Sequence, residues 1–259
     1  MGERTSHAAG TFSSVDLATS DADAAKAFYG ELFGWEAEDM AGAGGTYTIF
    51  RLDGKHVAGC FGTAEGGHAG FPPHWNSYVT VEDADASASR ATELGGSELL
   101  EAQDVEEIGR MAVIADPSGA AVALWESRGV IGAELVNAPG ALCWNDLATT
   151  DADGAVTFYG RLFGWTFEQV PAHQIRYRIR NGESENGSLY LQPEEERATP
   201  PNWLVYFATA DLAASNSRLG QLGGRVVVEP LELPTRGRVS VVTDPQGAAF
   251  GLFDGPLDP

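Results

Sequence analysis

The chain has 259 residues, enough for one large domain or two ordinary ones, and 43% of them are hydrophobic, as in folded globular proteins. Its 37 acidic residues against 16 basic residues give a net charge of −21, which repels phosphate backbones and argues against nucleic acid as a partner. No apolar run approaches the ~18 residues of a membrane span and MGERTSHAAG lacks an apolar signal core, so we expect no membrane association and a cytoplasmic location.

The first predicted module starts with a strand at residues 12–19, followed by a helix that begins near Asp21. Phe28 and Leu32 recur at helical spacing, and Gly34 supplies a left-handed stop. The stretches TYTIFRL and HVAGCFG then read as strands joined by a tight turn. With a third strand-like stretch after the helix, this order predicts a βαβββ module.

A second module follows, in which a different sequence predicts the same order of elements. WNSYVTVED predicts a strand, residues 84–94 predict a helix, and Gly95 and Gly96 end it. GRMAVIAD and AAVALWE predict two further strands, joined by a turn at residues 117–119.

The second half of the chain repeats the first. DADAAKAFYGELFGW begins at Asp21 and DADGAVTFYGRLFGW at Asp151, while GRMAVIADPSGAAVALWE begins at Gly109 and GRVSVVTDPQGAAFGLFD at Gly237. We therefore predict an α+β fold of four βαβββ modules in two domains, residues 8–130 and 137–256. Because one module covers only one face of its sheet, modules must pair, within a half or between halves, and leave a concave cleft.

The order of FY-x-x-L-F-G-W and D-P-x-G, present twice, resembles the vicinal oxygen chelate superfamily, which includes glyoxalase I, bleomycin-resistance proteins and extradiol dioxygenases. The chain is most similar to the tandem glyoxalase-like proteins of this superfamily. The resemblance implies two glyoxalase-like domains, each with a concave mixed sheet. The motif residues themselves predict helix ends and turns, and hence a fold and not an activity.

Metal-using members of the superfamily hold a divalent ion in the cleft through His, Gln or Glu on the module strands. The matching positions in this sequence are Ser14, Gly59, Asn76, Ala123, Trp144, Gly187, Leu204 and Gly251, none of them His, Asp or Glu. We therefore expect no metal and no other cofactor. The five histidines, at positions 7, 56, 68, 74 and 173, show no ligand spacing and are expected to be solvated. Cys60 and Cys143 are expected to be reduced and buried.

Strand alternation predicts what fills the clefts. If Ser14 faces a cleft, so does Asp16, and if Trp144 faces one, so does Asp146. The predicted ligand contacts are Ser14, Trp75, Asn76, Ala123, Trp125, Trp144, Trp203, Leu204, Gly251 and Phe253, where Trp75 and Trp203 are either cleft walls or helix-side core. Small and aromatic side chains with one carboxylate per half suit a flat organic ligand.

Asp16 and Asp146 are the candidate catalytic residues. Desolvation in an aromatic cleft would raise the pKa of either carboxyl and make it a general base or a hydrogen-bond acceptor. Alternatively, each caps a backbone donor or pairs with Arg110 or Arg238.

Two functions follow from these residues. The first is metal-free binding of a hydrophobic or aromatic metabolite, and the second is a cofactor-independent lyase or isomerase that uses an aspartate as base; a metal-dependent glyoxalase-like lyase or dioxygenase ranks third. We expect the second half, with Trp144 and Asp146, to carry the working cleft. The partner is a small molecule, and the protein is a monomer or a homodimer.

Overall fold

A computed structural model describes residues 2–42, 45–63, 70–171, 174–233 and 236–257. The first half forms β1 (Phe12–Thr19), α1 (Ala22–Phe33), β2 (Glu36–Gly42), β3 (Gly45–Leu52), β4 (Lys55–Gly62), β5 (His74–Thr80), α2 (Ala84–Glu93), β6 (Ser97–Val105), β7 (Gly109–Ala115) and β8 (Ala121–Ser127). The second half forms β9 (Leu142–Thr149), α3 (Ala152–Phe163), β10 (Thr166–Gln169), β11 (Arg176–Asn181), β12 (Ser184–Leu191), η1 (Glu194–Glu196), β13 (Asn202–Ala208), α4 (Leu212–Gln221), β14 (Arg225–Leu233), β15 (Gly237–Thr243) and β16 (Ala249–Asp254).

The predicted caps form the helix ends. Asp21 accepts a hydrogen bond from the backbone N–H of Ala24 at 3.0 Å, and Asp151 does the same for Gly154 at 2.9 Å. Gly34 ends α1 with φ at 76°, a left-handed conformation that glycine adopts without the cost of a Cβ clash.

Each half forms one eight-stranded mixed sheet, with strand order β2-β3-β4-β1-β5-β8-β7-β6 in the first and β10-β11-β12-β9-β13-β16-β15-β14 in the second. The two modules of a half meet through the antiparallel pairs β1–β5 and β9–β13. Modules therefore pair within each half, a point that the sequence left open, and the predicted α+β class with four βαβββ modules is confirmed.

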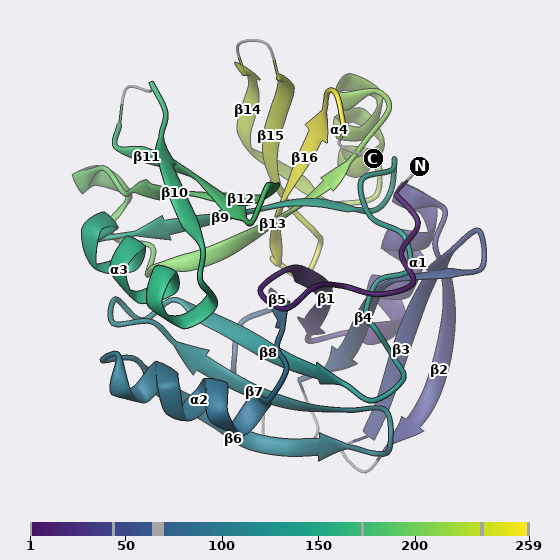
Figure 1. Cartoon of the computed structure of the whole chain (residues 1–259). Coiled ribbons are helices and arrows are strands. Elements are labelled where there is room, and N and C mark those ends of the chain that lie inside the picture. Colours follow the sequence, from purple (N-terminus) through teal and green to yellow (C-terminus); the bar gives the residue numbers. More distant parts are fainter. Residues whose placement is uncertain (1, 43–44, 64–69, 172–173, 234–235, 258–259) are drawn as a thin grey trace.

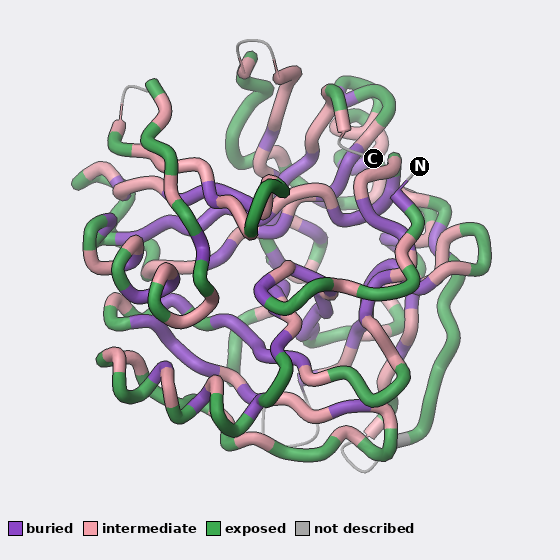
Figure 2. Tube along the Cα trace, in the orientation of Figure 1, coloured by how far each residue is buried: buried purple, intermediate pink, exposed green. Residues whose placement is uncertain are grey.

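The two sheets pack back to back, with β5 of the first in direct contact with β13 of the second, and the helices pair across the halves, α1 with α4 and α2 with α3 (Figure 1). One core cluster joins Phe28 and Tyr29 of α1 to Phe207 of β13 and Leu219 of α4, and a second joins α2 to α3 in the same way. Figure 2 shows buried segments concentrated in this middle layer and exposed outer hairpins. The concave face of each sheet therefore points away from the other half, and these two faces are called here the first and the second outer face.

Candidate functional site

The centre of the first outer face is Asp16, a buried carboxylate on β1. The strand register places Asp16 beside Gly59 of β4 and Asn76 of β5. Its carboxylate accepts hydrogen bonds from Asn76 Nδ2 at 2.9 Å, from Tyr78 Oη at 2.7 Å and, over a longer 3.4 Å, from Tyr47 Oη. The Asp16 side chain is thus held by three neutral donors, two from β5 and one from β3.

Gly59 makes room for one of these donors. A Cβ at this position would overlap the hydroxyl of Tyr47, which crosses from β3 toward Asp16. The absence of a side chain at position 59 thus lets the phenol reach the carboxylate.

The burial of Asp16 and its hydrogen bonds shift the pKa values of this carboxyl and of the tyrosines around it. Burial raises the pKa of Asp16, while the hydrogen bonds from Tyr78 and Asn76 and the charge of His74 act in the opposite direction. Burial also raises the pKa values of Tyr47 and Tyr78 well above their usual range, so both phenols stay protonated and donate. Asp16 can therefore accept a further hydrogen bond or a proton.

The second outer face places Asp146 in a different setting. Arg176 Nη1 lies 3.1 and 3.0 Å from the two Asp146 carboxylate oxygens, and Ser188 Oγ donates to the same carboxylate at 2.7 Å. Trp144 Nε1 donates to Ser188 Oγ at 2.9 Å, and the guanidinium of Arg176 lies 4.9 Å from the ring centre of Tyr190. Asp146 is therefore the anion of a half-buried ion pair and is poorly suited to act as a base.

The two faces differ at matching register positions. Tyr47 pairs with Phe61 as Arg176 pairs with Tyr190, and Asp16 pairs with Gly59 as Asp146 pairs with Ser188. Asn76 and Tyr78 of the first face correspond by the same register to Leu204 and Tyr206 of the second. The first face thus surrounds its carboxylate with neutral donors, whereas the second neutralises it with a guanidinium.

The donor set on the first face does not fit the divalent ion that the superfamily implies. The oxygens of Asp16 already accept bonds from an amide and two protonated phenols, none of which is a good ligand while it donates. The Asp146 carboxylate is likewise occupied, because it forms an ion pair with Arg176. Among the described residues no three His, Cys, Asp or Glu side chains come together in a metal-binding group.

The strand registers place most of the predicted contacts on the outer faces. Ser14, Asn76, Ala123 and Trp125 share the first outer face with Asp16, and Trp144, Leu204, Gly251 and Phe253 share the second with Asp146. Trp125 is nevertheless 8% exposed, and its Nε1 donates to the carbonyl of Val130 in the connection between the halves.

Trp75 and Trp203 require a correction. Both are 6% exposed and lie in the cores between the sheets, where their indole N–H groups donate to Tyr29 at 3.2 Å and Tyr159 at 3.0 Å. Since alternate residues of a strand face opposite sides, a position next to an outward residue points to the helices. Neither indole lies on an outer face.

Other assignments also change. Arg110 pairs with Asp85 and Asp104, and Arg238 pairs with Asp254, so neither arginine is the partner of Asp16 or Asp146. Ser188, and not Gly187, lies beside Asp146, because Ser188 holds the register position of Gly59 and Gly187 holds that of Ala58.

The histidines and cysteines agree only in part with what the sequence predicted. His56 is 9% exposed, and burial lowers its pKa, so it is not a solvated histidine. His68 and His173 lie outside the described residues. Both cysteines are free, and burial raises the pKa of the Cys60 thiol to about 12, which keeps it protonated.

Sequence reasoning missed several outward side chains, namely Tyr47, Tyr78, Arg176, Ser188, Tyr190 and Tyr206. Alternation from Asn76 would have found Tyr78, and alternation from Leu204 would have found Tyr206. No local signal identifies Tyr47 or Arg176, because each reaches its aspartate from two strands away.

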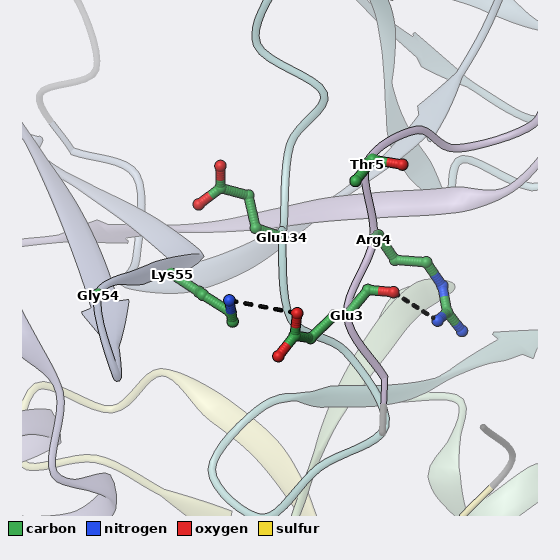
Figure 3. A pocket seen from close by; sticks show the side chains of 6 residues that line it. All are labelled: Glu3, Arg4, Thr5, Gly54, Lys55 and Glu134. Atoms are coloured by element: carbon green, nitrogen blue, oxygen red, sulfur yellow. Dashed lines mark hydrogen bonds and ion pairs between the residues drawn. The ribbon is translucent and has the colours of Figure 1, made fainter.

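The larger of two described surface hollows, about 420 Å³, lies elsewhere, beside the N-terminal segment (Figure 3). Glu3, Lys55 and Glu134 are among its lining residues, and Lys55 Nζ lies 3.3 Å from a Glu3 carboxylate oxygen. Glu134 accepts from the backbone N–H of His56 at 2.9 Å. Because these charges already pair with protein groups, we place the candidate site on the outer faces.

Comparisons with known proteins agree with this architecture. Over 98% of both chains, the protein is 40% identical to the candidate glyoxylase CFP32 of Mycobacterium tuberculosis. It is 36% identical to the anthracycline biosynthesis protein DauV of Streptomyces sp. strain C5, over 92% of this chain and 91% of that one.

Two solved structures share the fold at low sequence identity. The Mn(II)-bound glyoxalase of Novosphingobium aromaticivorans aligns with a TM-score of 0.67 and 15% identity, over 95% of this chain and 82% of that one. The 2,3-dioxygenase LapB of Pseudomonas sp. KL28 aligns with a TM-score of 0.65 and 15% identity, over 97% and 95%.

Each half of the chain also matches a family description by itself. Residues 10–124 match the Glyoxalase/Bleomycin resistance protein/Dioxygenase superfamily, and residues 143–253 match the Glyoxalase-like domain. The chain therefore belongs to the glyoxalase/bleomycin resistance protein/dioxygenase superfamily, with two tandem copies of its domain.

Proposed function

We propose that the protein binds a planar, hydroxylated organic molecule on the first outer face, without a metal, and that Asp16 accepts a hydrogen bond from the ligand. The observation that carries this proposal is the setting of Asp16, 2% exposed and held by neutral donors alone. The longest of its bonds, from Tyr47 at 3.4 Å, is the one that a ligand hydroxyl would replace at least cost.

The surroundings of Asp16 support a ligand of this class. Ser14, Tyr47, Asn76 and Tyr78 are half-buried on the same face, so they offer aromatic surface and polar groups together. The names of two relatives connect them with anthracycline biosynthesis and the name of another with glyoxylase activity, which favours a small organic ligand over a macromolecule.

The test is calorimetric titration with 2-hydroxyanthraquinone at mildly acidic pH, with 2-methoxyanthraquinone as the ligand that lacks the donor. Asp16→Asn and Tyr78→Phe should each weaken binding of the hydroxyl ligand by about tenfold or more, since each disturbs a charge-assisted hydrogen bond. Tyr177→Phe, which changes a tyrosine paired with Leu189 on the helix side, should bind as the unaltered protein does.

Two results would count against the proposal. Equal binding of the hydroxy and methoxy ligands would mean that no donor is recognised. Loss of binding after dialysis against a chelator, restored by a divalent ion, would mean that a metal and not Asp16 holds the ligand.

A second candidate function, proton abstraction by Asp16, is favoured by one observation, the raised pKa of this carboxyl, which brings it closer to that of an effective general base. Deuterium exchange into the CH₂ groups of 2-tetralone, followed by NMR in D₂O, separates the two functions. If Asp16 is a base, the unaltered protein catalyses the exchange and Asp16→Asn is slower by several orders of magnitude. If the protein only binds, neither form catalyses the exchange.

A further inference from the structure

We infer that the second outer face is a separate binding site of opposite polarity, which takes a planar aromatic carboxylate through the guanidinium of Arg176. This site goes beyond the proposed function, which concerns the first face, and it depends on different residues.

The guanidinium of Arg176 uses only some of its N–H donors in hydrogen bonds to described residues. Its hydrogen bonds to Asp146 and Ser188 all come from one nitrogen, Nη1, at 3.0 to 3.2 Å. Within the described part of the chain, Nε and Nη2 have no hydrogen-bond partner, and the side chain is 29% exposed. A guanidinium carries five N–H groups in a planar fork that matches a carboxylate. The fork is thus anchored at one corner with its other donors still available.

Aromatic side chains surround this fork. Tyr190 lies against the guanidinium, with its ring centre 4.9 Å from the Arg176 Cζ, and Trp144 is oriented by its bond to Ser188. Tyr206 lies beside Trp144 in the β9–β13 register, and both are half-buried. A flat ring attached to the carboxylate would find stacking surfaces on these side chains.

The local charge favours an anion in a chain whose net charge is −21. Three arginines gather around Glu185: Arg178 at 3.2 Å, Arg180 at 3.7 Å and Arg236 at 2.8 Å. Arg178 and Arg180 also lie 3.7 and 4.0 Å from Glu168. Arg236 directly precedes β15, which is four strands away from β12 in the sheet, and its guanidinium lies 5.8 Å from the Trp144 ring centre. Three arginines near the second outer face therefore share two carboxylates, those of Glu168 and Glu185.

The first face provides the internal comparison. At the register position of Arg176 it carries Tyr47, and its aspartate has neither an arginine nor a lysine as an ion-pair partner among the described residues. The two faces should therefore select ligands of different charge.

The experiment is calorimetric titration with anthraquinone-2-carboxylate, with the neutral anthraquinone-2-carboxamide as the matched ligand. We expect the unaltered protein to bind the carboxylate at least tenfold more tightly than the carboxamide, and Arg176→Gln to remove this preference. Arg161→Gln, an exposed arginine on α3, is the control for a general loss of positive charge.

Arg176→Lys keeps the charge opposite Asp146 and covers the case in which the glutamine variant does not fold. With its folded state verified by circular dichroism, the lysine variant should bind the carboxylate about tenfold more weakly, because an ammonium offers no fork. Equal affinity for carboxylate and carboxamide, unchanged binding in both Arg176 variants, or no binding of the carboxylate would overturn the inference.

The outcome is independent of the proposed function. Failure of 2-hydroxyanthraquinone to bind, with carboxylate binding intact and lost in Arg176→Lys, would reject the first face and leave the second. The opposite pattern would reject this inference alone.

Discussion

The hydroxyl of Tyr29 on α1 donates a 3.0 Å hydrogen bond to the carboxylate of Asp244, which belongs to the turn before β16 in the other half of the chain. The same Tyr29 oxygen accepts from Trp75 Nε1 at 3.2 Å. The other oxygen of Asp244 accepts from three backbone N–H groups of its turn. A helix of one half is thereby tied to a turn of the other by a fully buried polar chain.

The repeat generates a second copy of this link. Tyr159 donates to Asp116 at 3.1 Å and accepts from Trp203 at 3.0 Å. Each half therefore contributes one tyrosine from FYG and one aspartate from D-P-x-G, so that the repeated motifs bind each other between halves. The two halves should behave as one cooperative unit.

Removal of the Tyr29 hydroxyl tests this link. Tyr29→Phe leaves an Asp244 oxygen and the Trp75 N–H without their partner, and we expect it to lower the free energy of unfolding by about 1–3 kcal/mol. Urea denaturation followed by circular dichroism measures the change. Tyr177→Phe should change stability by much less, and a matching loss in that control would show that the cross-half bond is not responsible.

A methyl group at position 59 should interfere with Tyr47. Gly59→Ala places a Cβ where the Tyr47 hydroxyl lies, and we expect a cost of about 1–3 kcal/mol from overpacking. The cost should largely disappear in a Tyr47→Ala background, because the clash is then gone. A double-mutant cycle by urea denaturation measures this coupling, and equal costs in both backgrounds would contradict the close approach.

The Arg176–Asp146 pair should show the asymmetry expected of an ion pair whose carboxylate is buried. Arg176→Leu leaves Asp146, which is 5% exposed, without its cation and should destabilise the protein by about 2–4 kcal/mol. The double variant Arg176→Leu, Asp146→Leu should recover most of that loss, since no charge remains to be desolvated. A double variant less stable than Arg176→Leu alone would indicate that the pair itself is a net source of stability.

The raised pKa of Asp16 predicts a specific dependence of stability on pH. Between the ordinary value of 3.8 and the higher folded-state pKa, the folded protein holds a proton that the unfolded chain has lost. The Asp16 contribution is therefore fully present below 3.8 and is lost as the pH rises through the folded pKa. The stability of the unaltered protein relative to Asp16→Asn should fall over this window.

Asp39→Asn serves as the control of opposite sign. Hydrogen bonds from Thr48 and Lys26 lower the pKa of Asp39 below 3.8, so its contribution is present above that value and is lost as the pH falls. Urea titrations at a series of pH values measure both differences. A rise with pH in the Asp16 series would contradict the desolvation of this carboxyl.

The sequence by itself determined the modules. Helical spacing of Phe28 and Leu32, the cap at Asp21 and the stop at Gly34 act within a few residues of one another, so they can be read locally. Alternation along β1 likewise placed Ser14 and Asp16 on one face, because neighbouring side chains of a strand must point to opposite sides.

Only the tertiary structure decided what these side chains meet. Whether a tyrosine or an arginine reaches the central aspartate depends on the register between strands, and the same register places Ser188 instead of Gly187 beside Asp146. Trp75 was ambiguous for the same reason, since one residue of slip moves a side chain from an outer face to the core. The contrast between Asp16 and Asp146 therefore arises from contacts between strands distant in sequence, which no local pattern encodes.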